Sequence, residues 1–471
     1  MAPRDLVPLS YRVRRAIRMR NVTSSSLSTP APVTLLGIPG LRVHEVWELY
    51  AERVVLVDSP PGSGVCTGCG QRAESKGRAT VHLRDLPSAG KATRLVWVKR
   101  IWRCRDCRCA WRERHPGLPS RSVLTARARL EAARQVGELG RAVAAVARDF
   151  GVGWETIMRA VADEARVRFA DQDIYTIQAR PCLAIGVDEK VMNRGRRVLR
   201  RRRRFVTVIV DLARGVPLDI VEGRSKKVLK AWLAAQSPAW RAGVKIAALD
   251  PAAGYRAALT DPQVGLPNAQ VVLDRFHAEK LAGAAIDDCR RRVQQQTTGH
   301  RGRAGDPLYE TRKLLLIAGE RLDDEGATRL QDALAAGDPY EEVGCTHMAK
   351  ELLRAVYLSA DIFAARLALE QFFEWAVEVD VAEVTRLAKT IDRWRVELLA
   401  YFRTNRASSG PVEAVNGEIE QVDRIARGFR NFDNYRTRML LKTAVAWHTP
   451  ATPRLRGRAA QSDPAAPSFI A

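Results

Sequence analysis

The hydrophobic and polar positions change their spacing several times along the 471 residues, and each change predicts a different kind of structure. Residues 40–120 alternate apolar and polar side chains, which is typical of short, half-buried strands. Residues 121–180 change to the spacing of amphipathic helices. Strand-like segments and a helix alternate over 181–277, which predicts an α/β domain with a mixed sheet. Residues 278–405 are helical in pattern, with an interruption near 300–307, and one more helix is expected after Gly410.

The charge of the chain is strongly basic. Lys and Arg total 77 against 53 Asp and Glu, a formal net charge of +24. Such an excess favours a polyanionic partner, and nucleic acid is the most common one, although an Arg-rich proteome is an alternative explanation. No apolar run reaches the about 18 residues of a membrane span, so no membrane partner is expected. Eight Cys are too few for a disulfide scaffold, which favours a reducing cytoplasm.

Two Cys-x-x-Cys pairs predict a metal site in the first half of the chain. Cys66 and Cys69 form one pair, and Cys104 and Cys107 form the other. Four thiolates on two turns are a typical ligand set for a tetrahedral zinc ion. The strands between the pairs are expected to bring them together as a ribbon. Four protein ligands leave no open position on the ion, so this zinc would be structural.

Alternatives to this ligand set remain open in the sequence. The cysteines could be ordinary buried residues, or Cys109, His82 or His115 could replace one ligand. Basic and aromatic residues around the second pair predict a surface that lies on DNA: Lys99, Arg100, Trp102, Arg103, Trp111 and Arg112.

Residues 143–161 predict a helix-turn-helix motif. Two short apolar-periodic segments flank a turn at Gly151, and small residues in the first segment allow the two helices to cross closely. In this geometry the second helix enters the major groove of DNA and presents its N-terminal side chains. A helical hairpin inside a core is the alternative. The expected contacts to bases or phosphates are Trp154, Glu155 and Arg159.

Three carboxylates come at the ends of hydrophobic strand-like segments. They are Asp188, Asp250 and Asp274, and His277 follows the third. A carboxylate at a buried strand end is costly unless it is paired or binds a metal. Oxygen ligands favour Mg²⁺ or Mn²⁺, and two such ions suit the chemistry of phosphodiesters. The alternative is that each acid caps a helix or belongs to a loop.

The residues from about 35 to 448 resemble the transposases of bacterial insertion sequences of the ISL3 group. The resemblance rests on short segments in the order of that family: GVDE at 186–189, VTVIVDL at 206–212, VEGR at 221–224, DPAAGY at 250–255, LDRFH at 273–277, SGPVEAVN at 409–416 and GFRNF at 428–432.

This resemblance implies a ribonuclease-H-like core whose last helix is separated from the sheet by a helical insertion. It implies that Asp188, Asp250 and Glu413 are the catalytic acids, with two Mg²⁺ or Mn²⁺ ions per active site besides the one structural Zn²⁺. Asp274 and His277 are accessory candidates. It also implies binding to the terminal inverted repeats of the element and to target DNA, as a homo-oligomer that is at least a dimer.

The resemblance also places the run Arg200–Arg204 in a hairpin beside the active site. We expect phosphate contacts from Arg200, Arg201, Arg202, Arg203 and Arg204, and a solvated charged loop is an equal alternative.

The third acid cannot be chosen from helical spacing alone. Ser408 or Ser409 is expected to cap a helix that begins near Pro411. Glu413, Asn416 and Glu420 then share one stripe beside its apolar face, whereas Glu418 points away. Glu413 and Glu420 therefore remain rivals by geometry, and the resemblance favours Glu413.

The expected fold class is multidomain α+β. We expect a flexible basic tail at 1–39, a zinc-binding domain at 40–120 and a helix-turn-helix domain at 121–180. The α/β ribonuclease-H-like core is expected to begin at 181–277, to be interrupted by a helical insertion at 278–405 and to end with its last helix at 406–448. A second flexible tail is expected at 449–471.

Two functions of different classes fit this sequence. The first is a transposase that cleaves and joins DNA strands with divalent metal ions, located in the cytoplasm at the nucleoid. The second is a catalytically inactive relic that binds specific DNA and acts as a repressor. An intact set of acids favours the first, because a protein that only binds DNA gains nothing from buried carboxylates near it.

Overall fold

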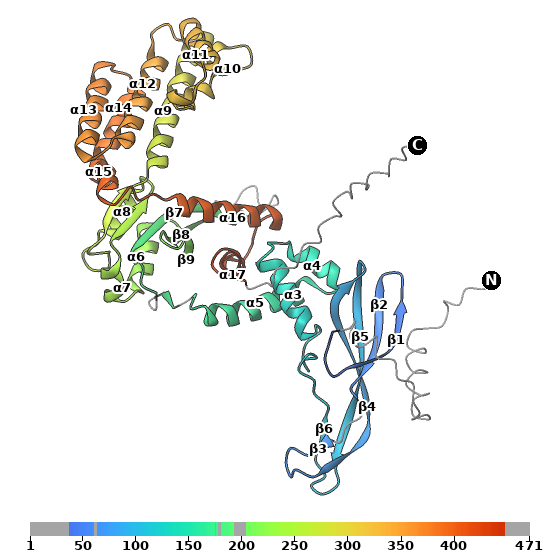
Figure 1. The fold of residues 1–471 in the computed structure, drawn as a ribbon. Helices are drawn as coiled ribbons and strands as arrows, with labels where there is room; N and C mark the ends of the chain where they lie inside the picture. The colour runs from blue at the N-terminus through green and yellow to red at the C-terminus, as the bar shows by residue number, and fades with distance from the viewer. Residues whose placement is uncertain (1–36, 61–63, 175, 178–179, 193–203, 448–471) are drawn as a thin grey trace, which may run out of the picture.

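The computed structural model describes residues 37–60, 64–174, 176–177, 180–192 and 204–447. The molecule is elongated (Figure 1), with a β-sheet module at one end, a second sheet in the middle and a group of helices at the other end. The two expected flexible tails, apart from residues 37–39, and Arg200–Arg203 lie outside the described residues. No helix in the described part of the chain is long and apolar enough to cross a membrane.

The N-terminal module is one sheet with the strand order β1-β2-β5-β4-β3, and β6 pairs with β5. The strands span Arg42–Glu48, Glu52–Asp58, Gly64–Val65, Arg72–Ser88, Lys91–Cys104 and Ala110–Arg112, from β1 to β6. The expectation of short strands is wrong for β4 and β5, which form a long antiparallel ribbon of 17 and 14 residues. Gly77 does not end β4, because it lies at a bulge in the register between the two strands.

Three helices follow the sheet: α3 (Ala126–Gly137), α4 (Val143–Phe150) and α5 (Trp154–Asp171). Gly151 ends α4 in the left-handed conformation, with φ of 63°, and its N–H bonds to carbonyls of the last turn. Glycine adopts this conformation without steric cost, which explains the sharp turn between α4 and α5. The predicted helix-turn-helix is therefore confirmed as two helices joined at this turn.

The central sheet has five strands in the order β11-β10-β7-β8-β9. β7, β8 and β9 pair antiparallel, whereas β10 and β11 run parallel to β7, so the expected mixed sheet is confirmed. The prediction that β7 ends at Asp188 is wrong, because its pairing with β8 continues to Met192. The strands β7 to β11 span Ala184–Met192, Arg204–Asp211, Val216–Glu222, Ile246–Leu249 and Gln270–Leu273.

Helices cover both faces of this sheet. The helices α6 (Lys226–Ala234), α7 (Pro238–Gly243) and α8 (Ala253–Leu259) share one hydrophobic cluster with it. On the other face, α16 (Gly410–Ala426) and α17 (Phe432–Thr443) share a second cluster with the sheet and with α3, α4 and α5. One helix was expected after Gly410, but there are two. The second was missed because its apolar residues pack on α3 and α5 as well as on the sheet, so they do not form a single stripe.

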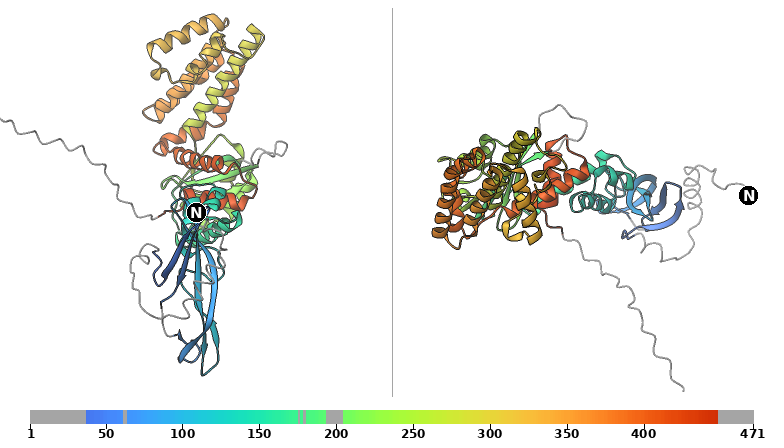
Figure 2. Two further views of the ribbon diagram at one scale, coloured as in Figure 1. Left: turned by 90° about the vertical axis from the view of Figure 1, so that its right-hand side faces the viewer. Right: turned by 90° about the horizontal axis from the view of Figure 1, so that it is seen from above.

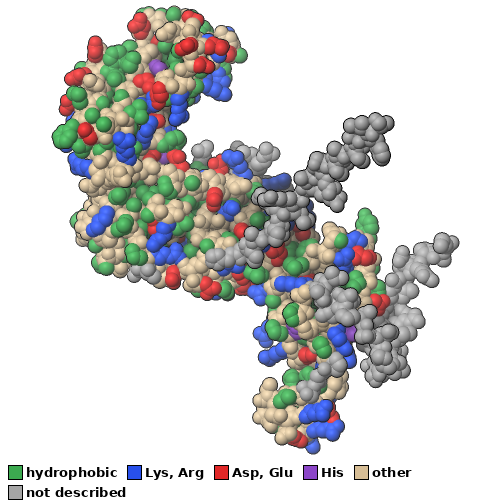
Figure 3. Space-filling model, viewed as in Figure 1, with side chains coloured by type: hydrophobic (Ala, Val, Ile, Leu, Met, Phe, Trp, Pro, Cys, Tyr) green, Lys and Arg blue, Asp and Glu red, His purple; other side chains and the backbone are tan. Residues whose placement is uncertain are grey.

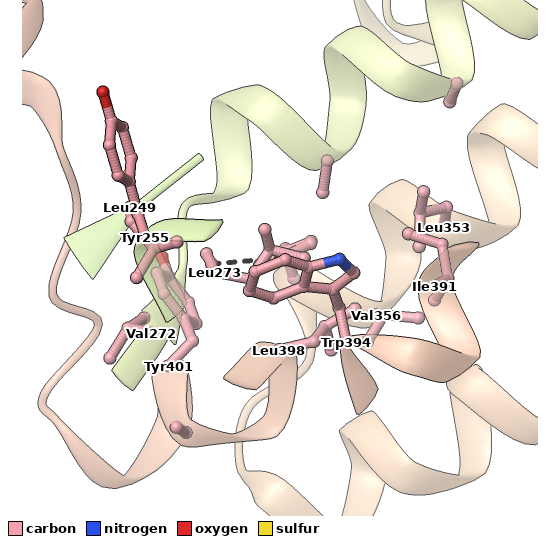
Figure 4. Packing of buried hydrophobic residues seen from close by; sticks show 14 of the residues in the cluster. Leu249, Tyr255, Val272, Leu273, Leu353, Val356, Ile391, Trp394, Leu398 and Tyr401 are labelled. Carbon is pink, nitrogen blue, oxygen red and sulfur yellow. Dashed lines mark hydrogen bonds between the residues drawn. The ribbon is translucent and has the colours of Figure 1, made fainter. Parts of the chain in front are cut away.

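The helical insertion rises from the sheet and returns to it (Figure 2). It begins with the 24-residue α9, which directly follows β11, and it ends with α15, which packs against the same strand. Figure 4 shows this junction, where Tyr401 and Leu398 lie beside Val272 and Leu273. The helices are α9 to α15 with two 3₁₀ turns, η2 and η3: Arg275–Thr298, Pro307–Glu310, Asp324–Gly337, Glu342–Leu358, Ile362–Glu378, Ala382–Arg393 and Arg395–Arg403, with Leu314–Leu316 and Gly319–Arg321.

Candidate functional site

The four predicted zinc ligands meet at the outer end of the β-ribbon. The sulfur atoms of Cys66, Cys69, Cys104 and Cys107 all lie within 4.8 Å of one another. Cys66 and Cys69 follow the short β3, whereas Cys104 is the last residue of β5. The ribbon therefore brings the two pairs together, as the sequence predicts. The cluster and its spacing support one structural zinc ion.

The environment of Cys66 favours the thiolate that binds metal. Backbone N–H groups of Gly68 and Cys69 donate to its sulfur and lower the pKa of Cys66 to about 7. The alternative ligands lie outside the cluster among the described residues. His115, for example, contacts the carbonyl oxygen of Pro39 at 2.9 Å.

The expectation that basic and aromatic residues of β5 face DNA is wrong for three of them. Lys99, Arg100 and Trp102 are buried. Arg100 donates to the carbonyl oxygens of Ser59 and Pro60 and stacks over Trp102 at 5.7 Å. Arg100 and Trp102 share one face of β5, whereas Lys99 lies on the other face over the ring of Trp97. The exposed side chains that remain on this surface are those of Arg103 and Arg112.

Removing one ligand should release the zinc. We expect about one zinc per chain in the purified protein, and loss of that zinc in Cys66→Ser or Cys104→Ser, because three thiolates hold the ion far less tightly than four. Metal analysis by mass spectrometry measures the stoichiometry, with Cys109→Ser as the matched control that keeps its zinc. Zinc-free wild-type protein purified without chelators would contradict the assignment.

The helix-turn-helix presents its predicted contacts to solvent. Trp154 and Glu155 lie in the first turn of α5, and Arg159 lies one turn further. All three are exposed, and Trp154 is 46% exposed although it is large and apolar. Ile157, Val161 and Phe150 face inward and hold α5 against α4. The outer face of α5 is therefore available to the major groove.

Acidic side chains gather at one edge of the central sheet. Asp188 lies in β7 and Asp250 follows β10, and these two strands are parallel neighbours with Val187 opposite Leu249. Parallel pairing puts both carboxylates at the same edge. Burial, and after it the charge of Asp250, raises the pKa of Asp188 to about 7. Two partly buried carboxylates at the same edge of the sheet favour the binding of a cation between them.

Asp274 and His277 lie at the same edge of the sheet and connect its acidic side chains. Asp274 follows β11 and caps α9 by accepting the N–H of Phe276 at 3.0 Å. Nδ1 of His277 lies 2.8 Å from Asp250 and 3.3 Å from Asp274. Burial opposes the charged imidazole, but hydrogen bonds to the two aspartates raise the pKa of His277 to about 9. The histidine therefore links the ends of β10 and β11.

The helix α16 closes the site from the other side of the insertion. Ligand atoms of Asp274, His277 and Glu413 lie within 4.8 Å of one another. In the described part of the chain, Asp188, Asp250 and Glu413 do not form so compact a set. Oε1 of Glu413 is buried and has no hydrogen-bond partner among the described residues. Burial, and then the charge of Asp274, raises the pKa of Glu413.

Asn416 is a site residue that the sequence analysis did not assign. Its Nδ2 donates to Oδ2 of Asp188 at 2.5 Å, across 228 positions of sequence. Its Oδ1 is buried without a partner among the described residues. Asn416 follows Glu413 by three positions on the same stripe of α16, and this spacing was the available signal.

The rivals of Glu413 lie away from the acidic edge. Glu420 is exposed and pairs with Arg424 and with Lys190. Glu418 is exposed as well. The expected side-chain cap of α16 is absent at Ser409. Its backbone N–H donates to Oδ1 of Asp274 at 2.8 Å, which links the start of the helix to the end of β11.

Gly186 sets the distance between α16 and the sheet. A Cβ at this position would collide with Cγ2 of Val412 and would lie 2.8 Å from Cδ2 of Leu212. The missing side chain lets α16 lie directly on β7. Val412 precedes Glu413 and Gly186 lies two residues before Asp188, so this close contact lies next to both acids.

Of the arginine run, Arg204 is the member that lies among the described residues. Arg204 is the first residue of β8, not part of a loop, and it pairs with Glu222. Its guanidinium also lies 3.5 Å from the carbonyl oxygen of Arg430. The strand pairing of Arg204 with Met192 explains this placement.

These features define a class of protein: a DNA-binding chain with a zinc ribbon, a helix-turn-helix and a carboxylate centre on a mixed sheet. Comparisons with known proteins agree with each part. Residues 185–439 match a family described as transposase, of the ISL3 group. Residues 62–107 match the zinc-finger of transposases IS204, IS1001, IS1096 and IS1165, and residues 113–165 match the helix-turn-helix domain of transposase family ISL3.

Individual relatives point the same way. The chain is 26% identical over 412 residues to the transposase for insertion sequence element IS1001 of Bordetella parapertussis, covering 84% of this chain and 94% of that protein. It is also 26% identical over 321 residues to the transposase for IS1557 of Mycobacterium tuberculosis, covering 64% and 68%. The chain belongs to the ISL3 family of transposases.

Proposed function

We propose that this transposase cleaves DNA at the terminal inverted repeats of its insertion sequence and joins the freed ends to target DNA. The observation that carries the proposal is the closure of the acidic edge by α16. It brings Glu413 and Asn416 to a sheet edge that already holds Asp188 and Asp250. Asp188, Asp250 and Glu413 come from separate parts of the chain and lie at one edge of the sheet, and partly buried carboxylates at such an edge are stabilised by a cation.

Divalent metal ions fit the residues present. The candidate ligands are oxygens, which Mg²⁺ and Mn²⁺ prefer. Two buried oxygens, Oε1 of Glu413 and Oδ1 of Asn416, lack partners among the described residues. Burial raises the pKa of Asp188 and of Glu413, and the negative charges of Asp250 and Asp274 raise them further, so a bound cation would stabilise both carboxylates. We propose that Asp188, Asp250 and Glu413 hold two such ions.

Bound in this way, the ions would activate a water molecule and stabilise the attacking and leaving oxygens of an in-line displacement. In the first reaction a water oxygen displaces the 3′ oxygen of one phosphodiester, which leaves a 3′-hydroxyl at the element end. In the second, that hydroxyl displaces a 3′ oxygen of target DNA. Neither reaction needs a covalent bond to the protein.

The remaining residues of the site position these acids. Asn416 orients Asp188 through its Nδ2 hydrogen bond. Asp274 bonds both to the start of α9 and to the start of α16, so one carboxylate fixes both ends of the insertion at the site. His277 contacts both Asp250 and Asp274 and so holds the two carboxylates in fixed positions relative to each other.

We further propose that α5 and the zinc ribbon bind the inverted repeat and that at least two copies act together on DNA. Binding can be tested by titrating the full-length protein into a labelled DNA that carries the element end. We expect its affinity to fall by about 10³ or more between 50 and 200 mM salt, if about six phosphates are neutralised. Fluorescence anisotropy measures this slope, and salt-independent binding would contradict the reading.

Mobility in cells tests the proposed function. A marker gene flanked by the inverted repeats found beside the gene, with the transposase supplied from a second plasmid, should move to new sites. An Asp188→Asn protein should bind the repeats and leave the marker in place. If the wild-type protein binds the repeats but never moves the marker, the chain is a DNA-binding relic.

A further inference from the structure

A pocket of about 320 Å³ opens beside the acidic centre, where the helical insertion joins the core. Its charged and aromatic lining is Asp274, Glu279 and Glu413, Arg275 and Arg406, and Phe276 and Tyr401; Arg275 pairs with Glu279 at 2.7 Å, which leaves Arg406 as the arginine that faces a ligand. Its volume lies at the lower end of the range of about 300–1,000 Å³ for small-molecule sites. It can therefore admit one nucleotide but not a duplex.

Phe276 presents an aromatic face at the rim of this pocket. The side chain is 54% exposed, although it lies in the first turn of α9 next to buried residues. Its ring meets the ring of His277 edge-on, with centroids 5.4 Å apart. His277 in turn contacts Asp250 at 2.8 Å. The aromatic face thus stands one side chain away from a proposed catalytic acid, where a nucleobase could stack on it.

Arg406 lines the same pocket, and a second cationic residue, Lys280, lies in the adjoining groove. Arg406 is exposed, and its guanidinium is steadied by the carbonyl oxygens of Ser359 and Ala360 at 3.2 and 3.4 Å. Lys280, one turn along α9 from Phe276, is exposed and forms no ion pair within the described residues. A nucleotide here would find positive charge for its phosphate within reach of its stacked base.

The pocket continues into a longer groove of about 870 Å³ along α9. The two cavities share Arg275, Phe276 and Glu279, and the groove adds Lys280 and the exposed Arg321. Basic side chains are visible on the lower part of the insertion (Figure 3). A single strand that leaves the acidic centre therefore has a continuous, partly basic path along α9.

We propose that this pocket binds one unpaired nucleotide of the DNA strand, adjacent to the phosphodiester at the acidic centre, with its base stacked on Phe276 and its phosphate near Arg406. This inference rests on the proposed function, because it takes the acidic centre as the place of cleavage. It assigns the foot of the helical insertion a role in holding the strand apart from its partner. Unpairing a base requires free energy, and stacking on an aromatic ring offsets part of it.

A double-mutant cycle between protein and DNA tests the pocket without cleavage. The full-length protein is titrated, without divalent metal, with a duplex that carries the element end and its flank. A series of such duplexes has an abasic nucleotide at one position after another around the end. We expect Phe276→Ala to weaken binding of the intact duplex by about 5- to 150-fold, and Phe276→Trp to restore it.

Removing the base that stacks on Phe276 should cancel this effect. At one position of the series, the wild-type and Phe276→Ala proteins should bind the abasic duplex equally well. Phe363→Ala, which changes an exposed phenylalanine on α13 outside the pocket, should bind every duplex like the wild type. If Phe276→Ala weakens binding of every duplex equally, or weakens binding of none, the proposed nucleotide pocket is wrong.

The outcomes also separate this inference from the proposed function. If the loss caused by Phe276→Ala disappears at one abasic position but the protein never cleaves DNA, the nucleotide pocket is supported and the cleavage chemistry is refuted. If the protein cleaves DNA but no abasic position cancels the effect of Phe276→Ala, the cleavage chemistry is supported and the pocket is refuted.

Discussion

The Glu413→Gln protein is expected to bind the element end with the affinity of the wild type and to cut it at least about a thousandfold more slowly. The substitution keeps the size of the side chain and removes one negative charge from the acidic centre. Metal ions at such a centre contribute several kcal/mol to the transition state, and each 1.36 kcal/mol is about tenfold in rate. The DNA-binding face of α5 is untouched. Cleavage of labelled end DNA, beside a gel-shift of the same DNA, measures both properties.

Two neighbouring glutamates on the same helix serve as matched controls. Glu418 and Glu420 are exposed, and Glu420 already pairs with Arg424 and Lys190. Glu418→Gln and Glu420→Gln should therefore keep measurable cleavage. Normal cleavage by Glu413→Gln would refute its assignment, and a loss confined to Glu420→Gln would move the third acid there.

The Gly186→Ala protein is expected to cut DNA about a hundredfold more slowly while its binding stays intact. The new methyl group would collide with Val412 and push α16 away from β7. Overpacking of this kind costs about 1–3 kcal/mol of stability, and a shift of about 1 Å in a reacting group can cost about a hundredfold in rate. The same cleavage and gel-shift assays apply, with the thermal unfolding midpoint as a check on folding.

A second substitution should reverse this defect. Val412→Ala removes the methyl group of α16 that the alanine at 186 would meet and leaves only the contact with the side-chain end of Leu212, so the double variant should recover most of its cleavage. Gly417→Ala, where an added Cβ has open space on the same helix, should cleave like the wild type. If Gly186→Ala alone cleaves normally, the contact between β7 and α16 does not position the site.

Local sequence patterns predicted the elements that short-range physics decides. The Cys-x-x-Cys pairs, the turn at Gly151 and the period of α16 depend on neighbours within a few residues. Asp250 and Asp274 were recognisable because each follows a short apolar strand. These features are readable without knowing how the chain is folded back on itself.

Contacts between distant segments could not be predicted in the same way. Asn416 meets Asp188, and Ser409 meets Asp274, only because the insertion returns to the strand from which it left. The burial of Arg100 depends on its pairing across the ribbon and on the carbonyls of Ser59 and Pro60. Such long-range partners decide whether a basic residue faces DNA or the core, and periodicity carries no signal for them.

Cleavage of a labelled element end by the purified protein tests the central claim most directly. The substrate is a duplex with the inverted repeat and its flank, incubated with Mg²⁺, with Mn²⁺, or with a chelator. The account predicts a cut that exposes a 3′-hydroxyl at the element end with either metal and none with the chelator. Tight, specific binding without a cut under any of these conditions would contradict it.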